Sequence, residues 1–385
     1  MNPINPRISR RDLLGSGVAA ALYAAGGRWS IAAEKKPAFA EELFAKPKLL
    51  DIKLKLSPKD TASLRKDPRI WVEAMATVDG QEFPRMGVHL KGTTSFMPLD
   101  RKPSFTLSTD HFVKGRRLIG LHKIHLNNSV QDTTFLCEDL AGELFHRAGV
   151  PRARSAWATV RLDDRDLGLY VLKEGFTNDF LAMNFGQTNG NFYDGGLHHD
   201  VFQPLKLESG DGPRDWSDLK ALHAASQLPD LSARWQTMQK LIEMDRFISM
   251  MALESLTCHI DGYSMMQNNF RIYFDPASGK AVFIVHGMDR MFKKTDDPLE
   301  PKLHAVLSKA VMSVPEGKAL YRARLSELVE KVFQQEWMTA RIDTAIRLLE
   351  PASPPMAISA RALRERIIAR VAFAKKGVAE FGIKA

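Results

Sequence analysis

The 385-residue sequence lacks the features that define several protein classes. It contains only two cysteines, Cys137 and Cys258, too few for a disulfide-stapled scaffold or a four-cysteine zinc site. Beyond the N-terminal region, no apolar run approaches the ~18 residues of a membrane-spanning helix, so we expect no stable membrane span. The HExxH zinc motif, the GxSxG nucleophile elbow and internal repeats are also absent from the sequence.

What is present is the composition of an ordinary globular chain. Hydrophobic residues make up 44% and charged residues 26% of the sequence, which disfavours disorder and a coiled-coil rod. At ~150 residues per domain, the length suggests two or three domain-sized blocks, or one domain with insertions. The formal net charge of +9 favours an anionic partner but does not identify it.

Residues 1–33 have the pattern of a twin-arginine export signal. Arg10-Arg11 precedes an apolar stretch at 13–25, and Ser30-Ile31-Ala32 offers small residues to a signal peptidase. A first amphipathic helix is the alternative. We expect export to the periplasm, the cell surface or the medium, and hence no nucleic-acid partner. This segment holds four arginines and one aspartate, so its removal would lower the net charge to +6.

Periodic hydrophobic patterns divide the rest of the chain into a linker at 34–48, a β-rich region at 49–175 and an α-rich region at 176–385. Strands are expected at 49–56, 71–78, 81–90, 104–108, 155–162, 168–174, 270–275 and 281–285. Helices are expected from Ser57 onward and at 132–148, 176–185, 217–225, 231–242, 245–258 and most of 300–384. This order predicts an α+β chain with two lobes, a mostly antiparallel β lobe and a mostly α lobe, with a ligand cleft between them.

Two short motifs resemble known sites but fit them poorly. The segment 87–94 has the glycine spacing of a phosphate-binding P-loop, but Thr93 stands where the lysine is required. His198-His199-Asp200 offers three metal ligands, but we favour a solvated polar turn there.

The most informative stretch is 258–292, in which His259-Ile260-Asp261 precedes a loop. Asn268-Asn269 then opens a β-hairpin, and Asp289 follows the second strand. Phosphoryl transfer needs a carboxylate at the acceptor hydroxyl, and an amide oxygen and a second carboxylate to hold magnesium against the phosphates. The ordered set therefore indicates a phosphotransferase site. A polar hairpin edge with an N-cap aspartate is the alternative.

The chain from about residue 87 to residue 292 resembles the spore-coat protein H (CotH) kinase family. The resemblance is carried by segments spread along the sequence. These segments are Leu90-Lys91-Gly92-Thr93-Thr94-Ser95, Arg101-Lys102-Pro103-Ser104-Phe105, Leu126-Asn127-Asn128 through Asp132 to Pro151, Gly168-Leu169-Tyr170-Val171-Leu172-Lys173-Glu174, and the block from Asp261 to Tyr273.

This resemblance implies an atypical protein-kinase-like fold and transfer of phosphate from ATP, with Mg²⁺ or Mn²⁺, to a protein Ser or Thr. By position, Asp261 would be the catalytic carboxylate. Asn268 or Asn269 would hold the metal together with Asp289.

The resemblance also implies three nucleotide-binding candidates. Lys102 is the first choice for the phosphate-binding lysine, and Lys91 is the second. Glu174 would line the nucleotide pocket or pair with a basic residue. Glu138 and Glu143 are candidates to pair with Lys102.

One departure from the family bears on activity. The family usually shows Trp-Asp-x-Asp after the hairpin, whereas this chain has His286-Gly287-Met288-Asp289, so one carboxylate is missing. Fewer anionic ligands should weaken magnesium binding. His286 suits softer metals, and we expect it to pack or to act as a supporting hydrogen-bond donor.

The alternative function is therefore a non-catalytic envelope or surface module that binds an anionic polymer or a protein partner through its C-terminal helices. Its charge would come from Arg361, Arg364, Arg366, Arg370, Lys375 and Lys376. The sequence does not decide whether Cys137 and Cys258 pair in an oxidising compartment or stay buried as free thiols. It also leaves the acceptor and the oligomeric state open.

Overall fold

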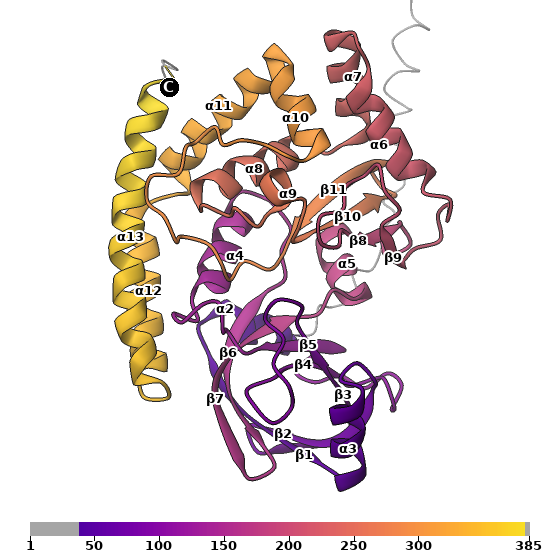
Figure 1. Ribbon diagram of the computed structural model, residues 1–385, viewed down its shortest axis with the longest axis vertical. Coiled ribbons are helices and arrows are strands. Elements are labelled where there is room, and N and C mark those ends of the chain that lie inside the picture. Colours follow the sequence, from indigo (N-terminus) through magenta and orange to yellow (C-terminus); the bar gives the residue numbers. More distant parts are fainter. Residues whose placement is uncertain (1–37, 382–385) are drawn as a thin grey trace, which may run out of the picture. The chain divides into compact units, whose positions relative to one another are not determined.

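The computed structural model describes residues 38–381, so the predicted export signal at 1–33 lies outside the described residues. The described residues from Phe39 onward form one compact unit. The chain is a mixed α+β protein, as expected (Figure 1). Its division into two lobes near residue 175 stays a prediction.

Seven strands close into a β-barrel in the order β1-β2-β3-β4-β5-β7-β6 (Figure 1). They are β1 (Leu49–Leu56), β2 (Val72–Val78), β3 (Gln81–Lys91), β4 (Ser104–Ser108), β5 (Lys123–Asn127), β6 (Ser155–Leu162) and β7 (Arg165–Glu174). Neighbouring strands are antiparallel except β1 and β6, whose parallel pairing completes the circle. The antiparallel strands were predicted, but β5 and the closure were not.

The alternating strands bury one face inside the barrel. In β1, Leu50, Ile52 and Leu54 are buried while the residues between them are exposed, as the sequence Leu-Leu-Asp-Ile-Lys-Leu-Lys-Leu predicts. Val88, Leu90, Phe105, Leu107, Ile124 and Leu126 join them in the same apolar cluster. The opposite, outward face of β3, β4 and β5 is therefore free to carry polar side chains.

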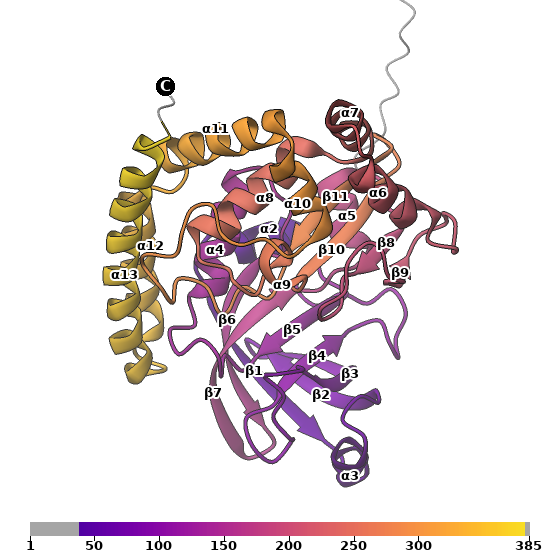
Figure 2. The same ribbon diagram turned by 45° about the horizontal axis from the view of Figure 1, so that its top comes forward.

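The remaining elements build a second sheet and a set of helices. The sheet has the order β11-β10-β8-β9, from β8 (Phe192–Asp194), β9 (Lys206–Ser209), β10 (Phe270–Asp275) and β11 (Lys280–Val285). The helices are α2 (Ala38–Ala45), α3 (Pro58–Lys66), α4 (Cys137–Arg147), α5 (Asn178–Phe185), α6 (Ser217–Gln227), α7 (Leu231–Leu241), α8 (Met244–Leu256), α9 (Tyr263–Met266), α10 (Val306–Ser313), α11 (Pro315–Lys331), α12 (Gln335–Leu349) and α13 (Pro354–Ala379). Helices α12 and α13 lie side by side (Figures 1 and 2). Helix α2 lies within the predicted linker, and β8 and β9 lie in a segment for which no strand was predicted.

Helix α4 begins later than its hydrophobic pattern predicts, at Cys137 instead of residue 132. The Asp132 carboxylate accepts hydrogen bonds from the backbone N–H groups of Thr134 and Cys137, at 2.9 Å each. This bends residues 132–136 into a turn and supplies an acceptor for the first N–H group of the helix.

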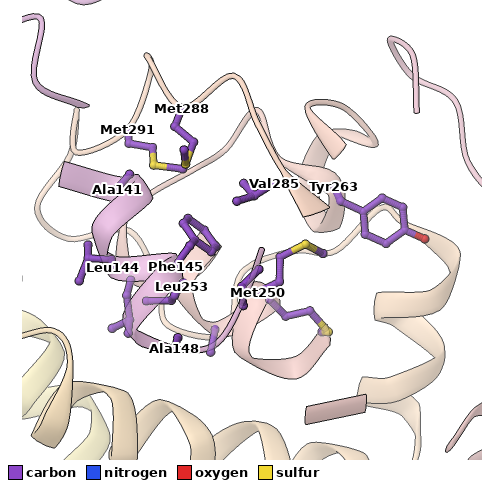
Figure 3. Packing of buried hydrophobic residues seen from close by; sticks show 14 of the residues in the cluster. Ala141, Leu144, Phe145, Ala148, Met250, Leu253, Tyr263, Val285, Met288 and Met291 are labelled. Atoms are coloured by element: carbon purple, nitrogen blue, oxygen red, sulfur yellow. The ribbon is translucent and has the colours of Figure 1, made fainter. Parts of the chain in front are cut away.

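The apolar face of α4 packs into the larger hydrophobic core. Figure 3 shows Leu144 and Phe145 of α4 in one cluster with Leu253 of α8 and with Met288, which follows β11. Burial of this face fixes α4 against the segment that carries Asp289.

Three further predictions can be compared with the structure. Cys137 and Cys258 are buried free thiols. Between residues 38 and 381, no helix is both long and apolar enough to cross a membrane. The expected solvated turn at His198-His199-Asp200 is confirmed for the two histidines, which are exposed, but is wrong for Asp200. Its carboxylate is fully buried and accepts hydrogen bonds from Tyr263, Gln267 and the backbone of Val306.

Candidate functional site

A row of polar side chains crosses the outward face of the barrel. The registers place His89 opposite Thr106, Thr106 opposite His125, and His125 opposite Lys173. Residues that are directly opposite on one face lie within side-chain contact distance. Thr106 and His125 confirm this, since Thr106 Oγ1 lies 3.1 Å from His125 Nδ1. We call these four residues the polar row.

Lys173 at the end of the polar row forms a buried ion pair with Glu138 of α4. Its Nζ lies 2.5 Å from Glu138 Oε1, and both side chains are less than 10% exposed. The other carboxylate oxygen, Glu138 Oε2, accepts a hydrogen bond from the backbone N–H of Met288 at 3.1 Å. Glu138 therefore connects a barrel strand, helix α4 and the turn that carries Asp289. We call residues 286–292 the Asp289 turn.

Lys91 lies beside this ion pair at the end of β3. Its Nζ donates a 2.6 Å hydrogen bond to Asn127 Oδ1 on β5. Burial, together with the nearby ammonium of Lys173, lowers the pKa of Lys91 to about 7. The carboxylates of Glu138 and Asp289 oppose this shift. Lys91 is therefore a desolvated cation that a phosphate group would stabilise.

Asp261 is held by the two asparagines that follow it. Asn268 Nδ2 donates to Asp261 Oδ1 at 3.1 Å, and Asn269 Nδ2 donates to the backbone oxygen of Asp261 at 2.9 Å. The guanidinium of Arg290 lies 3.7 Å from Asp261 Oδ2. The structure therefore brings Asp261, both asparagines and the Asp289 turn together. We call residues 257–269 the Asp261 loop.

Buried groups behind the Asp261 loop fix its path. Glu254 accepts hydrogen bonds from the backbone N–H groups of Tyr263 and Ser264, and burial raises the pKa of Glu254 to about 7. His259 is fully buried, and neither ring nitrogen has a hydrogen-bond partner within residues 38–381. Burial lowers the pKa of His259 to about 4, so its imidazole is neutral near pH 7.

Asp289 is a desolvated carboxylate. Burial raises its pKa to about 6, and the negative charge of Glu138 adds to the shift, while Lys173 opposes it. A cation bound at this carboxylate would offset the cost of burying its charge.

Gly287 stands where the family usually has the first aspartate, and the folded turn leaves no room for a side chain at this position. Its φ of +62° lies in the left-handed region, and an added Cβ would lie 2.2 Å from Asn269 Oδ1. The residue before Gly287 is also bonded to Asn269, since the backbone N–H of His286 donates to the backbone oxygen of Asn269 at 3.1 Å. The amide of Asn269 thus occupies the space that a side chain at position 287 would need.

One predicted pairing differs from the contacts that the structure shows. Lys102 Nζ donates to the backbone oxygen of Leu169 and lies over the Phe135 and Tyr170 rings, so the predicted pairing with Glu138 or Glu143 is not formed. Glu143 instead lies 2.8 Å from the guanidinium of Arg147.

Glu174 is buried and binds Arg154 in a two-point ion pair, with N–O distances of 2.7 and 2.9 Å. This is the pairing with a basic residue that the sequence left open. The lysine that pairs with the helix is Lys173, its neighbour, which the prediction missed. The sequence did contain a signal that Lys173 and Glu174 have different surroundings: they are adjacent in a predicted strand, and adjacent residues of a strand point to opposite faces of the sheet.

The donor atoms at the site fit magnesium better than a softer metal. Among residues 38–381, no group of three or more His, Cys, Asp or Glu side chains could hold a metal ion. The available donors are oxygens: the Asp289 carboxylate, the Asp261 carboxylate and the amides of Asn268 and Asn269. Magnesium in nucleotide enzymes uses one or two carboxylates and completes its shell with phosphates and water.

A cavity of about 420 Å³ opens at the other end of the same barrel face. Its lining includes Ser108 and Lys123, which the β-sheet registers place beside the polar row. Trp71 and His111 also line it and stack on each other, with ring centroids 4.5 Å apart. The other lining residues are Asp110, Lys114, His122, Thr177 and Asn178.

Comparison with known proteins gives matches over most of the described chain. The profile of the family described as CotH kinase protein matches residues 88–357. The Bacillus subtilis inner spore coat protein H is 19% identical over 319 residues, which cover 76% of this chain and 85% of that protein. Invasin CotH2 of Rhizopus delemar is 22% identical over 260 residues, which cover 59% of this chain but only 44% of the relative. Among solved structures, the Helicobacter pylori proinflammatory kinase CtkA matches with a TM-score of 0.36 and 10% identity, covering 73% of this chain and 95% of the kinase chain.

The packing of Asn269 on Gly287 gives a stability prediction. We expect Gly287→Asp to lower the free energy of unfolding by about 2 kcal/mol more than Gly279→Asp, because both glycines have positive φ but only Gly287 lacks room for a Cβ. In the Asn269→Gly background, the extra cost should fall substantially. Urea unfolding measures all four variants. Equal costs at the two glycines, or no coupling to Asn269, would contradict the packing.

Proposed function

Because the chain belongs to the CotH kinase protein family, which its residues 88–357 match, we propose that it transfers the γ-phosphate of ATP to a Ser or Thr hydroxyl of a protein. The observation that supports this most strongly is the convergence of Asp261, its two asparagines and the Asp289 turn beside Lys173 and Lys91. This set supplies the parts that phosphoryl transfer requires, which are positioning and charge neutralisation.

In this proposal Asp261 orients the acceptor hydroxyl and accepts its proton. Its Oδ1 is fixed by Asn268, while Oδ2 faces Arg290 at 3.7 Å. Asp289 and the asparagine amides hold the Mg²⁺ or Mn²⁺ ion, which would supply positive charge at the phosphate oxygens when bound. Lys91 and Lys173 lie on the barrel side of the same space and would contact the phosphates.

In this proposal the nucleotide lies along the outward face of the barrel. Lys123 lines the cavity and Asn127 binds Lys91, and both project from the same face of β5. Four residues of strand span about 13 Å, which is comparable to the length of an extended nucleoside triphosphate. The phosphates would therefore lie at Lys91 and Lys173, with the base in the cavity against Trp71 or His111.

The proposal extends to a two-lobed kinase-like arrangement, in which the barrel is one wall of the cleft and the helices carry the other. It also retains the exported location predicted from residues 1–33. Because ATP is scarce outside the cytoplasm, transfer before export or a different phosphate donor belongs to the same proposal.

A nucleotide-binding protein without transferase activity is the second candidate, and Gly287 favours it. The turn offers one carboxylate where the family usually has two, so fewer anionic ligands remain for the metal. Polymer binding by the C-terminal helix is less favoured, because Arg370 is fully buried and Arg366 binds the backbone oxygen of Phe292.

Phosphate transfer tests the first candidate. Asp261→Asn and Asp289→Asn should each lower the rate of label transfer from radiolabelled ATP by at least about 100-fold, because each removes a carboxylate from the reacting centre. Asp164→Asn, in the exposed β6–β7 turn, is the matched control and should keep the wild-type rate. Transfer to Ser/Thr-rich acceptors is measured with magnesium and with manganese. If both site variants keep the wild-type rate, the assignment is wrong.

The direction of the nucleotide is tested by separating the base from the phosphates. Trp71→Leu should weaken ATP binding about 10-fold, because base–aromatic stacking contributes ~1–3 kcal/mol. The same change should leave inorganic tripolyphosphate binding unaltered. Calorimetric titration measures both ligands, with Trp337→Leu on α12 as the control. Equal weakening of both ligands, or of neither, would contradict the placement of the base.

A further inference from the structure

Helix α13 carries a buried arginine whose side-chain hydrogen bonds all go to backbone oxygens. Arg370 is fully buried. Its guanidinium donates to the oxygens of Ser255 at 2.7 Å, Leu256 at 3.0 Å, Thr295 at 3.4 Å and Asp297 at 2.5 Å. One side chain thus links two separate segments of the chain to α13.

The first segment is the C-terminal end of α8, which runs directly into the Asp261 loop. Helices end with unpaired carbonyl groups and a partial negative charge, so a cation at Ser255 and Leu256 stabilises this end. The second segment, at Thr295 and Asp297, follows the Asp289 turn. The guanidinium therefore binds the backbone just before the Asp261 loop and just after the Asp289 turn.

Arg366, one helical turn earlier on the same face of α13, adds a contact to the Asp289 turn itself. Its Nε donates to the backbone oxygen of Phe292 at 3.0 Å. The N–H of Phe292 donates in turn to the oxygen of Thr257 at 2.8 Å, in the Asp261 loop. The two segments are thus joined to each other as well as to α13.

Anchoring of α13 does not require these charges. Leu363, Ile367, Val371 and Ala374 bury its apolar face in the large core. A buried guanidinium costs solvation energy that an apolar residue would not, so its four directed contacts are the feature to explain.

We infer that Arg370, assisted by Arg366, is a positioning residue that fixes the Asp261 loop relative to the Asp289 turn. Its effect on catalysis rests on the proposed function, whereas its effect on the two segments does not. Both arginines lie beyond residue 357, where the family match ends. This part of α13 therefore supports the site from outside the matched region.

Hydrogen–deuterium exchange tests the positioning without reference to activity. In Arg370→Met, four backbone oxygens lose the hydrogen bond from the guanidinium, so amide exchange in peptides covering 255–262 and 289–298 should rise about 10-fold or more. Exchange in the barrel strands and in α11 should stay unchanged. Arg361→Met, an exposed position on the same helix, is the control and should change neither segment.

Two milder variants keep the test decisive if Arg370→Met folds poorly. Arg370→Lys, which retains one cation but not the forked donor geometry, should give a smaller rise in the same two segments. Arg366→Met should raise exchange chiefly in the Asp289 turn. A uniform rise across the molecule, or no rise in either segment for all three variants, would overturn the inference.

Kinetics supply the second readout. If the wild-type protein transfers phosphate, Arg370→Met should lower kcat about 10-fold or more while the KM for ATP changes less than about 3-fold, since misalignment acts on the chemical step. Arg370→Lys should recover part of kcat. An unchanged kcat in a variant whose segments have loosened would overturn the catalytic part. A wild-type protein without transfer would refute the proposed function, and the exchange result would then decide the positioning alone.

Discussion

The candidate site depends on the buried carboxylate of Glu138. One of its oxygens pairs with Lys173 on the barrel, and the other accepts the N–H of Met288 next to Asp289. Removing either charged partner would leave the other buried without compensation, which commonly costs ~3–5 kcal/mol. This pair therefore joins the barrel wall that carries Lys91 and Lys173 to the turn that carries Asp289.

The charges around this pair are consistent with the proposed binding of an ATP–magnesium complex. Lys91, Lys173 and Arg271 together lower the pKa of His125 and of His286, in addition to the effect of burial. The same environment lowers the pKa of Lys91 to about 7 and raises that of Asp289 to about 6. A phosphate group beside the lysines and a divalent ion beside Asp289 would stabilise the charged form of both groups.

The sequence predicted the parts of this arrangement that depend on local patterns. The alternation of apolar and polar residues identified β1, and the order of Asp261, Asn268 and Asn269 identified residues that the structure brings into contact. Barrel closure was not predicted, because the parallel pairing of β1 with β6 joins segments about 100 residues apart and leaves no local signal.

The predicted pairing of Lys102 with α4 was wrong for a related reason. Lys102 and Lys173 both lie near strands, but only the register across β4, β5 and β7 shows which of them faces α4. Gly287 was identified as a lost carboxylate, but its positive φ and the amide of Asn269 above it are features of the folded turn. Helix α4 likewise begins where the Asp132 side chain allows it to, rather than where its apolar pattern starts.

The most direct test of this account is the thermal unfolding of the full chain with ATP alone, MgCl₂ alone and both together. A ligand that binds only the folded state raises the midpoint temperature according to its concentration and affinity. We expect a rise with ATP and magnesium together that neither gives alone. The rise should be lost in Lys173→Met and kept in Lys102→Met. No rise with both ligands, or an equal rise in Lys173→Met, would contradict the central claim that these groups together bind a metal–nucleotide complex.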